Sequence, residues 1–314
     1  MMKKNLVIIA ARGIGDLIYH LPLLRSLYQS YKEKLILISN KVNHSKEVYK
    51  FENFYNEIIE FDNTRFSFFK TLKTFNNFKK LINSYNADQI ILTASSRRLM
   101  APVYFSNAKK KIIFGGRKFL FGKNSTYNNL THAEKIMKYT EDLNLPILNK
   151  NFFLAKNSLN LIDDNDKILK ILINLDSHHD QNNWDIKNYI KIILTILPLK
   201  VKIFINFSPN KLSFLKFLPN EILNSKNISF TYKKNISEII EIINSCKIII
   251  GNESGPICLG ASLKKEVHSV YLPIHTKPES QIINDKTFYY NADQENNENI
   301  INKILEKVIN QTKK

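Results

Sequence analysis

The sequence predicts an α/β protein made of two doubly wound, parallel-sheet domains. Two short glycine loops, at residues 11–16 and 251–256, carry this prediction because each lies between an apolar run and a helical pattern. The chain of 314 residues, 44% of them hydrophobic, can fill two cores. A glycine turn that opens a helix presents free backbone N–H groups and the positive end of the helix dipole. We therefore expect two anion sites at strand ends, with both domains facing one central cleft.

In the first half, strand patterns and helix patterns alternate, which is typical of a parallel sheet. The apolar run 6–10 predicts a strand, and leucines at helical spacing predict a helix over 14–31. Pro22 within this helix predicts a kink or marks where the helix begins. The same patterns predict further strands at 34–39, 58–61, 87–92 and 111–115, and helices at 66–85 and 132–143.

A polar segment around residues 157–166 has no strong period, so we expect domains at 1–158 and 159–314. The second half repeats the alternation of strands and helices. Ser237 is the expected N-cap of one of its helices. The predicted strands are 168–174, 201–206, 228–230, 247–250 and 267–272, and the predicted helices are 238–244 and 299–310.

The net charge of +18 is concentrated in the first half of the chain. Residues 1–155 hold 25 Lys and Arg against 11 Asp and Glu, a net charge of +14, whereas the remainder carries +4. This asymmetry predicts an anionic partner, either a phosphorylated glycolipid or a membrane surface, unless it reflects a solvated lysine-rich surface. The sequence has neither an RNA-binding signature nor a recognition-helix motif, so we expect no nucleic-acid partner.

The cysteine count and the N-terminal segment indicate a cytoplasmic protein. Two cysteines, Cys246 and Cys258, exclude a framework of several disulfides and a four-thiolate zinc site. The first residues run into a strand without a signal-peptide pattern, and no apolar stretch approaches the roughly 20 residues of a membrane span. We expect a soluble or peripheral protein.

Asp16 is the first candidate catalytic residue. It follows the turn formed by Gly13 and Gly15, where a carboxylate at the strand end is able to accept a proton from a nucleophilic hydroxyl. The alternative is a carboxylate that complements the helix dipole. The turn does not complete G-x-G-x-x-G because residue 18 is Ile18, which disfavours a nicotinamide cofactor.

The second loop contains the candidate phosphate ligands. Ser254 offers a hydroxyl donor, Gly255 allows the backbone to approach a phosphate, and Pro256 suits the first turn of a helix. A well-capped structural helix is the alternative. We expect Cys258, just beyond this turn, to be a small buried hydrophobe rather than a nucleophile.

Four further features are candidates for function. The segment His178-His179-Asp180 lacks suitably spaced additional ligands, so we expect no metal. Trp184 is expected to be a packing anchor at a helix start. Thr276 and Lys277 are expected either to contact phosphate or sugar oxygens or to form a solvated loop. Arg97 and Arg98 follow a strand, so their planar guanidinium groups are expected near its carboxyl end, where they suit phosphate.

These motifs resemble those of glycosyltransferase family 9, the ADP-heptose:lipopolysaccharide heptosyltransferases. Members open with a strand, a G-x-G-D-[LIV] turn and a P-L-L-R-x-L helix, which match residues 13–17 and 22–27. Later they carry an apolar strand, [DE]-[ST]-G-P and an alanine-rich helix, which match residues 253–263. Weaker matches fall in the same order at 85–97, 131–134 and 183–184, so the resemblance spans nearly the whole chain.

The resemblance implies a GT-B fold and an inverting enzyme that transfers a heptose or related sugar without a metal or cofactor. The donor would then be an ADP-sugar, and the acceptor would be the anionic lipopolysaccharide core or another cell-envelope glycan. Peripheral contact with the cytoplasmic face of the inner membrane is then expected. Asp16 falls on the family's proposed base. The donor site in the second domain would include Glu253, Ser254, Gly255, Pro256, Thr276 and Lys277. The acceptor site in the first domain would include Gly13, Gly15, Arg97 and Arg98.

Three departures from the family pattern keep other functions open. Asn182 and Asn183 replace a basic residue before the tryptophan, Lys211 replaces an acidic residue, and Cys258 replaces a histidine. A catalytically diverged sugar-nucleotide or glycan binding protein of the same fold is the main alternative. A nucleotide-dependent oxidoreductase is a weaker one, because the glycine fingerprint is incomplete.

Overall fold

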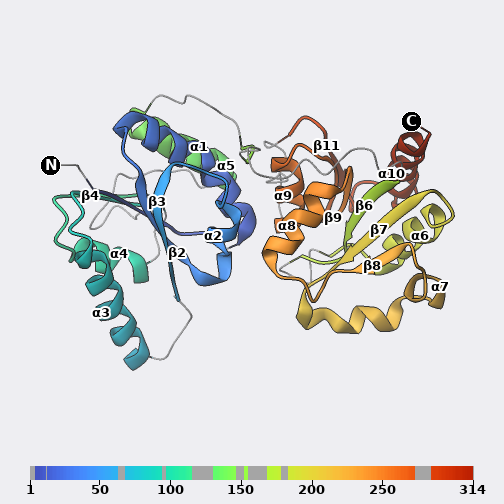
Figure 1. Ribbon diagram of the computed structural model, residues 1–314, viewed down its shortest axis with the longest axis horizontal. Helices are drawn as coiled ribbons and strands as arrows, with labels where there is room; N and C mark the ends of the chain where they lie inside the picture. The colour runs from blue at the N-terminus through green and yellow to red at the C-terminus, as the bar shows by residue number, and fades with distance from the viewer. Residues whose placement is uncertain are drawn as a thin grey trace. The chain divides into compact units, whose positions relative to one another are not determined.

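A computed structural model of the chain divides into two compact units, Met1–Leu154 and Ala155–Lys314 (Figure 1). The structure describes residues 4–11, 13–62, 68–93, 97–114, 130–145, 152–154, 168–177, 183–272 and 284–313, with the side chains of 68–72 and 97–98 left out. The domain boundary expected after residue 158 falls between described segments and stays a prediction. Each unit is an α/β domain with an all-parallel sheet, so the predicted fold class is confirmed.

The first unit has a five-stranded sheet in the order β3-β2-β1-β4-β5. Its strands are β1 (Asn5–Ile9), β2 (Leu35–Asn40), β3 (Tyr55–Phe61), β4 (Gln89–Leu92) and β5 (Lys110–Ile113). Its helices are α1 (Ile14–Tyr31), α2 (Ser45–Val48), α3 (Phe68–Ser84), α4 (Arg97–Tyr104) and α5 (His132–Asp142), with a 3-10 turn η1 (Lys41–Asn43).

Helices cover both faces of this sheet. Helices α1 and α5 pack together on one face, and α3 and α4 cover the other (Figure 1). Strands β1 and β4 are therefore buried along their whole length, which explains their unbroken apolar runs. Pro22 does not mark a helix start, because α1 begins at Ile14 and continues through the proline.

The second unit has a six-stranded sheet in the order β11-β10-β9-β6-β7-β8. Its strands are β6 (Leu169–Asn174), β7 (Val201–Asn206), β8 (Ile228–Phe230), β9 (Ile248–Asn252), β10 (Glu266–Tyr271) and β11 (Thr287–Asn291). Its helices are α6 (Ile186–Ile196), α7 (Asn220–Leu223), α8 (Ile236–Ser245), α9 (Gly255–Ser262) and α10 (Asn297–Thr312), with a 3-10 segment η3 (Pro209–Phe217).

The two sheets share one topology. Counted from its own first strand, each has the order 3-2-1-4-5, and the second unit adds a sixth strand beyond the fifth. In such sheets all strands run parallel, but the direction in which successive strands are added reverses between strands one and four, and ligands bind at the carboxyl ends of those strands. The switch points are therefore between β1 and β4 in the first unit, and between β6 and β9 in the second.

The cap of α8 differs from the prediction. Asn235, not Ser237, is the N-cap, because its side chain accepts from the N–H of Glu238 at 3.0 Å. The Glu238 carboxylate in turn accepts from the N–H of Asn235 at 2.9 Å. This reciprocal capping box needs Glu or Gln three residues after the cap, which Asn235 has and Ser237 lacks.

Among the helices of the described segments, none is long and apolar enough to cross a membrane.

Candidate functional site

The first switch point joins the glycine loop to the end of β4. The N–H of Ala10, just after β1, donates to the Thr93 hydroxyl at 3.1 Å, and Thr93 follows β4. Gly13 has an extended backbone with φ −164°, which any residue adopts. A Cβ built on Gly13 would meet no atom of the described residues within 4 Å. This glycine therefore lies in open space rather than in a strained turn.

Asp16 lies where the N-terminal ends of two helices meet. It occupies the first turn of α1 and is only 7% exposed. The first residue of α5 is His132, and its Nε2 lies 4.0 Å from Asp16 Oδ1. Thr131 caps α5 by accepting from the N–H of Glu134 at 3.3 Å. Because both helix dipoles have their positive ends here, the region suits an anionic substrate next to a proton-accepting carboxylate.

His20, one turn further along α1, is a second histidine that contacts Asp16. Its Nδ1 lies 2.6 Å from the Asp16 carbonyl oxygen, so Nδ1 must carry a proton and donate it to that acceptor. Its Nε2 lies 2.8 Å from the Thr93 hydroxyl, which donates to this nitrogen when the ring is neutral. The bonds Ala10 to Thr93, Thr93 to His20 and His20 to Asp16 form one chain that fixes the first turn of α1 to the end of β4.

The His20 ring is neutral at pH 7. Burial, with a smaller contribution from repulsion by His132, lowers the pKa of His20 to about 4, although its hydrogen bond to the Asp16 backbone and the charge of Asp16 act in the opposite direction. The two imidazole rings lie 5.5 Å apart between centroids. His20 therefore acts as a hydrogen-bonding brace with both nitrogens occupied, not as a group that exchanges protons at neutral pH.

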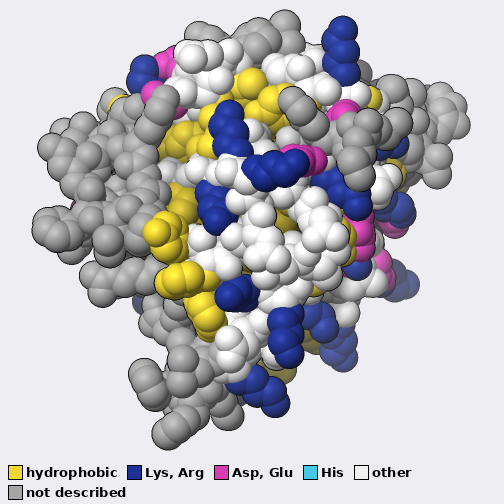
Figure 2. Space-filling view, turned by 90° about the vertical axis from the view of Figure 1, so that its left-hand side faces the viewer, with side chains coloured by type: hydrophobic (Ala, Val, Ile, Leu, Met, Phe, Trp, Pro, Cys, Tyr) yellow, Lys and Arg dark blue, Asp and Glu magenta, His cyan; other side chains and the backbone are white. Residues whose placement is uncertain are grey.

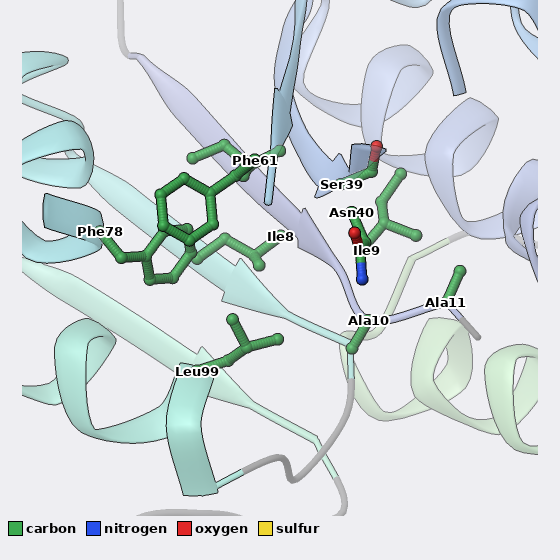
Figure 3. Close-up of a pocket in the computed structure, with 10 residues that line it drawn as sticks. Ile8, Ile9, Ala10, Ala11, Ser39, Asn40, Phe61, Phe78 and Leu99 are labelled. Carbon is green, nitrogen blue, oxygen red and sulfur yellow. The ribbon is translucent and has the colours of Figure 1, made fainter. Parts of the chain in front are cut away.

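A cavity of about 200 Å³ lies beside the glycine loop, at the carboxyl ends of β1 and β2 (Figure 3). Phe61 and Phe78 form one wall with ring centroids 4.7 Å apart, and Leu99 of α4 faces them. Ser39 and Asn40 place polar groups at its edge. An apolar cavity with a few polar groups at its edge is typical of a small-molecule site.

In the second unit, three neighbouring strands each end in asparagine. The Nδ2 of Asn206 donates to Oδ1 of Asn174 at 2.5 Å, and the Thr231 hydroxyl donates to Oδ1 of Asn206 at 2.7 Å. Asn252 is fully buried and accepts from the N–H of Trp184 at 2.7 Å. This network along the carboxyl edge of the sheet is built from uncharged groups.

Ser254 is linked to this network across the second switch point. Its Oγ accepts from Nδ2 of Asn174 at 3.1 Å, and its side chain does not cap α9. The serine hydroxyl proton is therefore directed away from Asn174 and is available to a phosphate oxygen. Gly251 permits this arrangement, because a Cβ there would lie 2.6 Å from the backbone oxygen of Asn174.

Asp176 and Lys211 bring opposite charges to the same edge. Asp176 is 4% exposed, and its carboxylate accepts from the N–H of Ser208 at 3.1 Å. Burial raises the pKa of Asp176, while the Ser208 hydrogen bonds and the positive charge of Lys211 act to lower it. Lys211 thus places positive charge at the edge that contains Ser254.

Trp184 is a packing anchor, as predicted. Its ring is 4% exposed and meets Tyr189 edge-on with centroids 5.1 Å apart, and its Nε1 donates to Asn297 at 2.7 Å. Asn183, which stands where the family pattern has a basic residue, braces its loop by accepting from the N–H of Ser177 at 2.7 Å.

The remaining candidates from the sequence divide into described and undescribed residues. Glu253 and Gly255 flank Ser254 at the end of β9 and the start of α9, and Pro256 occupies the first turn of α9. Arg97 and Arg98 open α4 just after β4, but their side chains lie outside the described residues. His178, His179, Asp180, Asn182, Thr276 and Lys277 also lie outside them. Gly15 lies in the first turn of α1.

The cysteines are buried, as expected for Cys258. Cys258 is 4% exposed within α9, and Cys246 is 1% exposed after α8. Burial raises the pKa of the Cys246 thiol to about 12.

Several polar residues of both candidate sites are not predicted by the sequence patterns. Thr93 reaches His20, and His132 reaches Asp16, only through the fold, because these contacts join different elements, whereas His20 lies one turn after Asp16 within α1. The asparagines did have a signal in the sequence. Three apolar runs end in Asn174, Asn206 and Asn252, and the ends of parallel strands meet at one edge.

The chain is similar to known proteins in structure rather than in sequence. No protein-family model matches the sequence, and no curated protein is similar to it in sequence. Among solved structures, the glycosyl transferase family 9 protein from Veillonella parvula DSM 2008 is similar with a TM-score of 0.77 and 16% identity, over 98% of this chain and 90% of that chain.

Two heptosyltransferases from E. coli are also similar. For heptosyltransferase WaaC with ADP, the TM-score is 0.74 at 15% identity, over 98% of this chain and 99% of that chain. For ADP-heptose lps heptosyltransferase II, the TM-score is 0.69 at 15% identity, over 91% of this chain and 90% of that chain. At such identities the likeness shows the fold, which is that of the GT-B glycosyltransferases.

Proposed function

We propose that the protein is an inverting glycosyltransferase that transfers a heptose or related sugar from an ADP-sugar to an anionic cell-envelope glycolipid. The observation that carries the proposal is Asp16, buried at the meeting point of two helix N-termini with His132 at 4.0 Å. The GT-B fold, shared with family 9 glycosyltransferases, supports it. In proteins of this topology the carboxyl edge of the sheet is where ligands bind.

In the proposed reaction, Asp16 accepts the proton of the acceptor hydroxyl while the acceptor oxygen bonds to the anomeric carbon. The bond between that carbon and the diphosphate oxygen breaks in the same step, and its electron pair leaves with the diphosphate. Attack on the face opposite the leaving group inverts the configuration. His132 would orient the Asp16 carboxylate, and His20 would hold the backbone turn that carries it.

The donor diphosphate would bind at the second switch point. The Ser254 hydroxyl and the N–H of Gly255 offer hydrogen bonds, and the α9 dipole adds positive potential. Glu253, Pro256, Thr276 and Lys277 are proposed as further donor-site residues. WaaC was solved with ADP, which supports an adenosine diphosphate sugar as donor. No metal or cofactor is needed in this proposal.

The acceptor would bind the first unit, which carries the larger positive charge. Gly13, Gly15, Arg97 and Arg98 are proposed to contact its phosphates and sugars, and the apolar cavity beside Ala10 is open to a non-polar part of it. Such an acceptor would bring the protein to the cytoplasmic face of the inner membrane as a peripheral protein.

The donor class is tested by thermal denaturation with a panel of ADP-, UDP- and GDP-sugars. A ligand at about 100 times its dissociation constant adds roughly 2.7 kcal/mol to the free energy of unfolding. We expect this shift with ADP-sugars. A shift confined to other nucleotides would contradict the proposed donor.

A catalytically diverged binding protein of the same fold is the alternative, and Asn183 favours it, because a loop-bracing amide replaces a cation. The two functions differ in turnover. An enzyme releases ADP from an ADP-sugar slowly even without acceptor, and Asp16→Asn should abolish that release. Tight ADP-sugar binding without Asp16-dependent turnover, with or without glycolipid, would establish the binding protein.

A further inference from the structure

Two large aromatic side chains at the end of α4 are exposed to solvent. Tyr104 is 41% exposed and Phe105 is 57% exposed, and their rings meet edge-on with centroids 5.1 Å apart. Phe75 of α3 approaches Phe105 with a centroid distance of 6.4 Å. The three rings therefore form one apolar surface on the helices that cover one face of the first sheet. Contiguous exposed apolar groups of this kind mark interaction sites.

Lysine side chains surround these rings. The Nζ of Lys79 lies 5.9 Å above the Phe105 ring, and the Nζ of Lys111 donates to the backbone oxygen of Tyr104 at 3.0 Å. Lys109 and Lys110 are exposed at the edge strand β5, where Lys109 also pairs with Asp88 at 3.1 Å. Figure 2, which views this side of the molecule, shows hydrophobic and basic side chains next to one another. We call Phe75, Lys79, Tyr104, Phe105 and Lys109–Lys111 the aromatic–lysine patch.

We propose that the aromatic–lysine patch docks the protein on an anionic phospholipid bilayer. The rings of Tyr104 and Phe105 enter the interface between headgroups and acyl chains, where amphipathic and aromatic side chains are favoured. The lysines contact anionic headgroups, and each contributes to the electrostatic attraction. Long lysine stems can follow the apolar surface while their ammonium groups stay in water.

The composition of the patch favours lipid over a protein partner. Lysine is a flexible point charge that suits many mobile headgroups, whereas a specific carboxylate or phosphate is better held by the planar fork of arginine. The patch also belongs to the half of the chain with a net charge of +14. The proposal deepens the proposed function, because a glycolipid acceptor resides in such a bilayer.

The second unit supplies a matched control. Phe217 at the end of η3 is 62% exposed, Leu212 is 50% exposed, and Lys211 and Lys216 adjoin them in sequence. The half of the chain that contains them has a net charge of only +4. If any exposed aromatic beside a lysine were sufficient, this second segment would bind vesicles equally well.

The test is co-sedimentation of the full chain with vesicles of phosphatidylcholine, with or without phosphatidylglycerol, in the absence of any nucleotide sugar. We expect binding to the anionic vesicles alone, weakening as salt is added. Tyr104→Ser with Phe105→Ser should weaken binding about tenfold or more. Lys109→Gln with Lys110→Gln should weaken it several-fold at low salt. Leu212→Ser with Phe217→Ser should leave it within about twofold of the wild type.

A tryptophan reporter locates the contact directly. Trp184 is buried and provides a constant background, so Phe105→Trp and Phe217→Trp each add one exposed reporter. Brominated anionic lipids should quench the Phe105→Trp emission and spare that of Phe217→Trp. Thermal melts check that each variant is folded.

Several outcomes would overturn the proposal. Absence of binding to any vesicle would point to an acidic protein as the occupant, and equal binding by the serine variants would exclude the patch. Quenching of Phe217→Trp alone would move the contact to the second unit. ADP-sugar binding is measured separately by thermal shift, so failure of the membrane contact and failure of the proposed function are distinguishable.

Discussion

The glycine loop of the first unit follows its first strand, β1, whereas that of the second unit follows its fourth strand, β9. The two loops therefore stand on opposite sides of equivalent switch points. Beside the first loop are the Asp16 carboxylate, the imidazole of His132 and the neutral imidazole of His20, which braces the turn. Beside the second are amide and hydroxyl groups in the network around Asn174. One topology thus carries different side chains at its two switch points, and under the proposed function the first would take the acceptor proton and the second would bind the donor diphosphate.

The largest effect that this comparison predicts is on transfer. Asp16→Asn should lower the rate of sugar transfer about 10²–10⁴-fold, because the amide cannot take the acceptor proton. Donor affinity, measured by calorimetric titration with ADP, should change less than twofold, since the proposed donor site belongs to the other unit. Full activity would show that Asp16 is not the base. Loss of ADP binding would contradict the proposal that proton transfer and donor binding belong to different units.

The reverse pattern is expected for the second loop. Ser254→Ala removes a hydroxyl donor to a charged phosphate oxygen and should weaken ADP binding about ten- to hundredfold. Gly255→Val should abolish it, because a branched side chain would stand where the backbone approaches phosphate. Ser262→Ala, at the buried far end of α9, is the control. Wild-type ADP affinity in both loop variants would make the loop a structural cap.

The third prediction concerns His20 and the pH dependence of the free energy of unfolding. Its pKa of about 4 in the folded protein is below the ordinary value of 6.5, so the unfolded chain binds more protons between those values and stability falls as pH falls. Between pH 7 and pH 5 we expect wild type to lose about 2 kcal/mol more than His20→Gln, whose amide can replace both hydrogen bonds. Urea unfolding at the two pH values measures the difference. Parallel losses in both proteins would show that His20 does not titrate as described.

Lys211 should give the smallest effect. It contributes positive charge near Asp176 without being deeply buried, so Lys211→Met should weaken ADP binding about two- to fivefold at low salt. The difference should shrink as salt is added. Lys202→Met, on β7 of the same unit, is the control. Unchanged ADP affinity at low salt would mean that the positive charge of Lys211 acts on Asp176 and not on bound ADP.

The sequence predicted those parts of the fold that depend on local patterns. Helix α1 and strands β7 and β8 have the predicted bounds, because apolar spacing and turn residues specify them directly. Helix α4 was not predicted, since it is short and contains Pro102. Strand β11 was also missed, because only Tyr290 of its five residues is buried and the segment has no strong alternation of apolar and polar residues.

The candidate site was predictable to a similar extent. Asp16 and Ser254 are identified as candidates because each lies in a glycine loop, and such a loop is recognised from a few consecutive residues. Thr93 and His132 could not be found, because their contacts join elements that are far apart in the chain. His20 is only one helical turn from Asp16, but its role as a brace depends on Thr93 at the end of β4. The acceptor and donor assignments themselves stay predictions until the variants above are measured.

The burial of both cysteines makes the protein a convenient host for chemical labelling. With a pKa of about 12, Cys246 is ionised in roughly one molecule in ten thousand at pH 8, and Cys258 is shielded within α9. Thiol reagents require an accessible thiolate, so the natural chain should react very slowly. A single cysteine introduced at an exposed position would then take up a spin or fluorescent probe alone, and the native thiols need not be replaced.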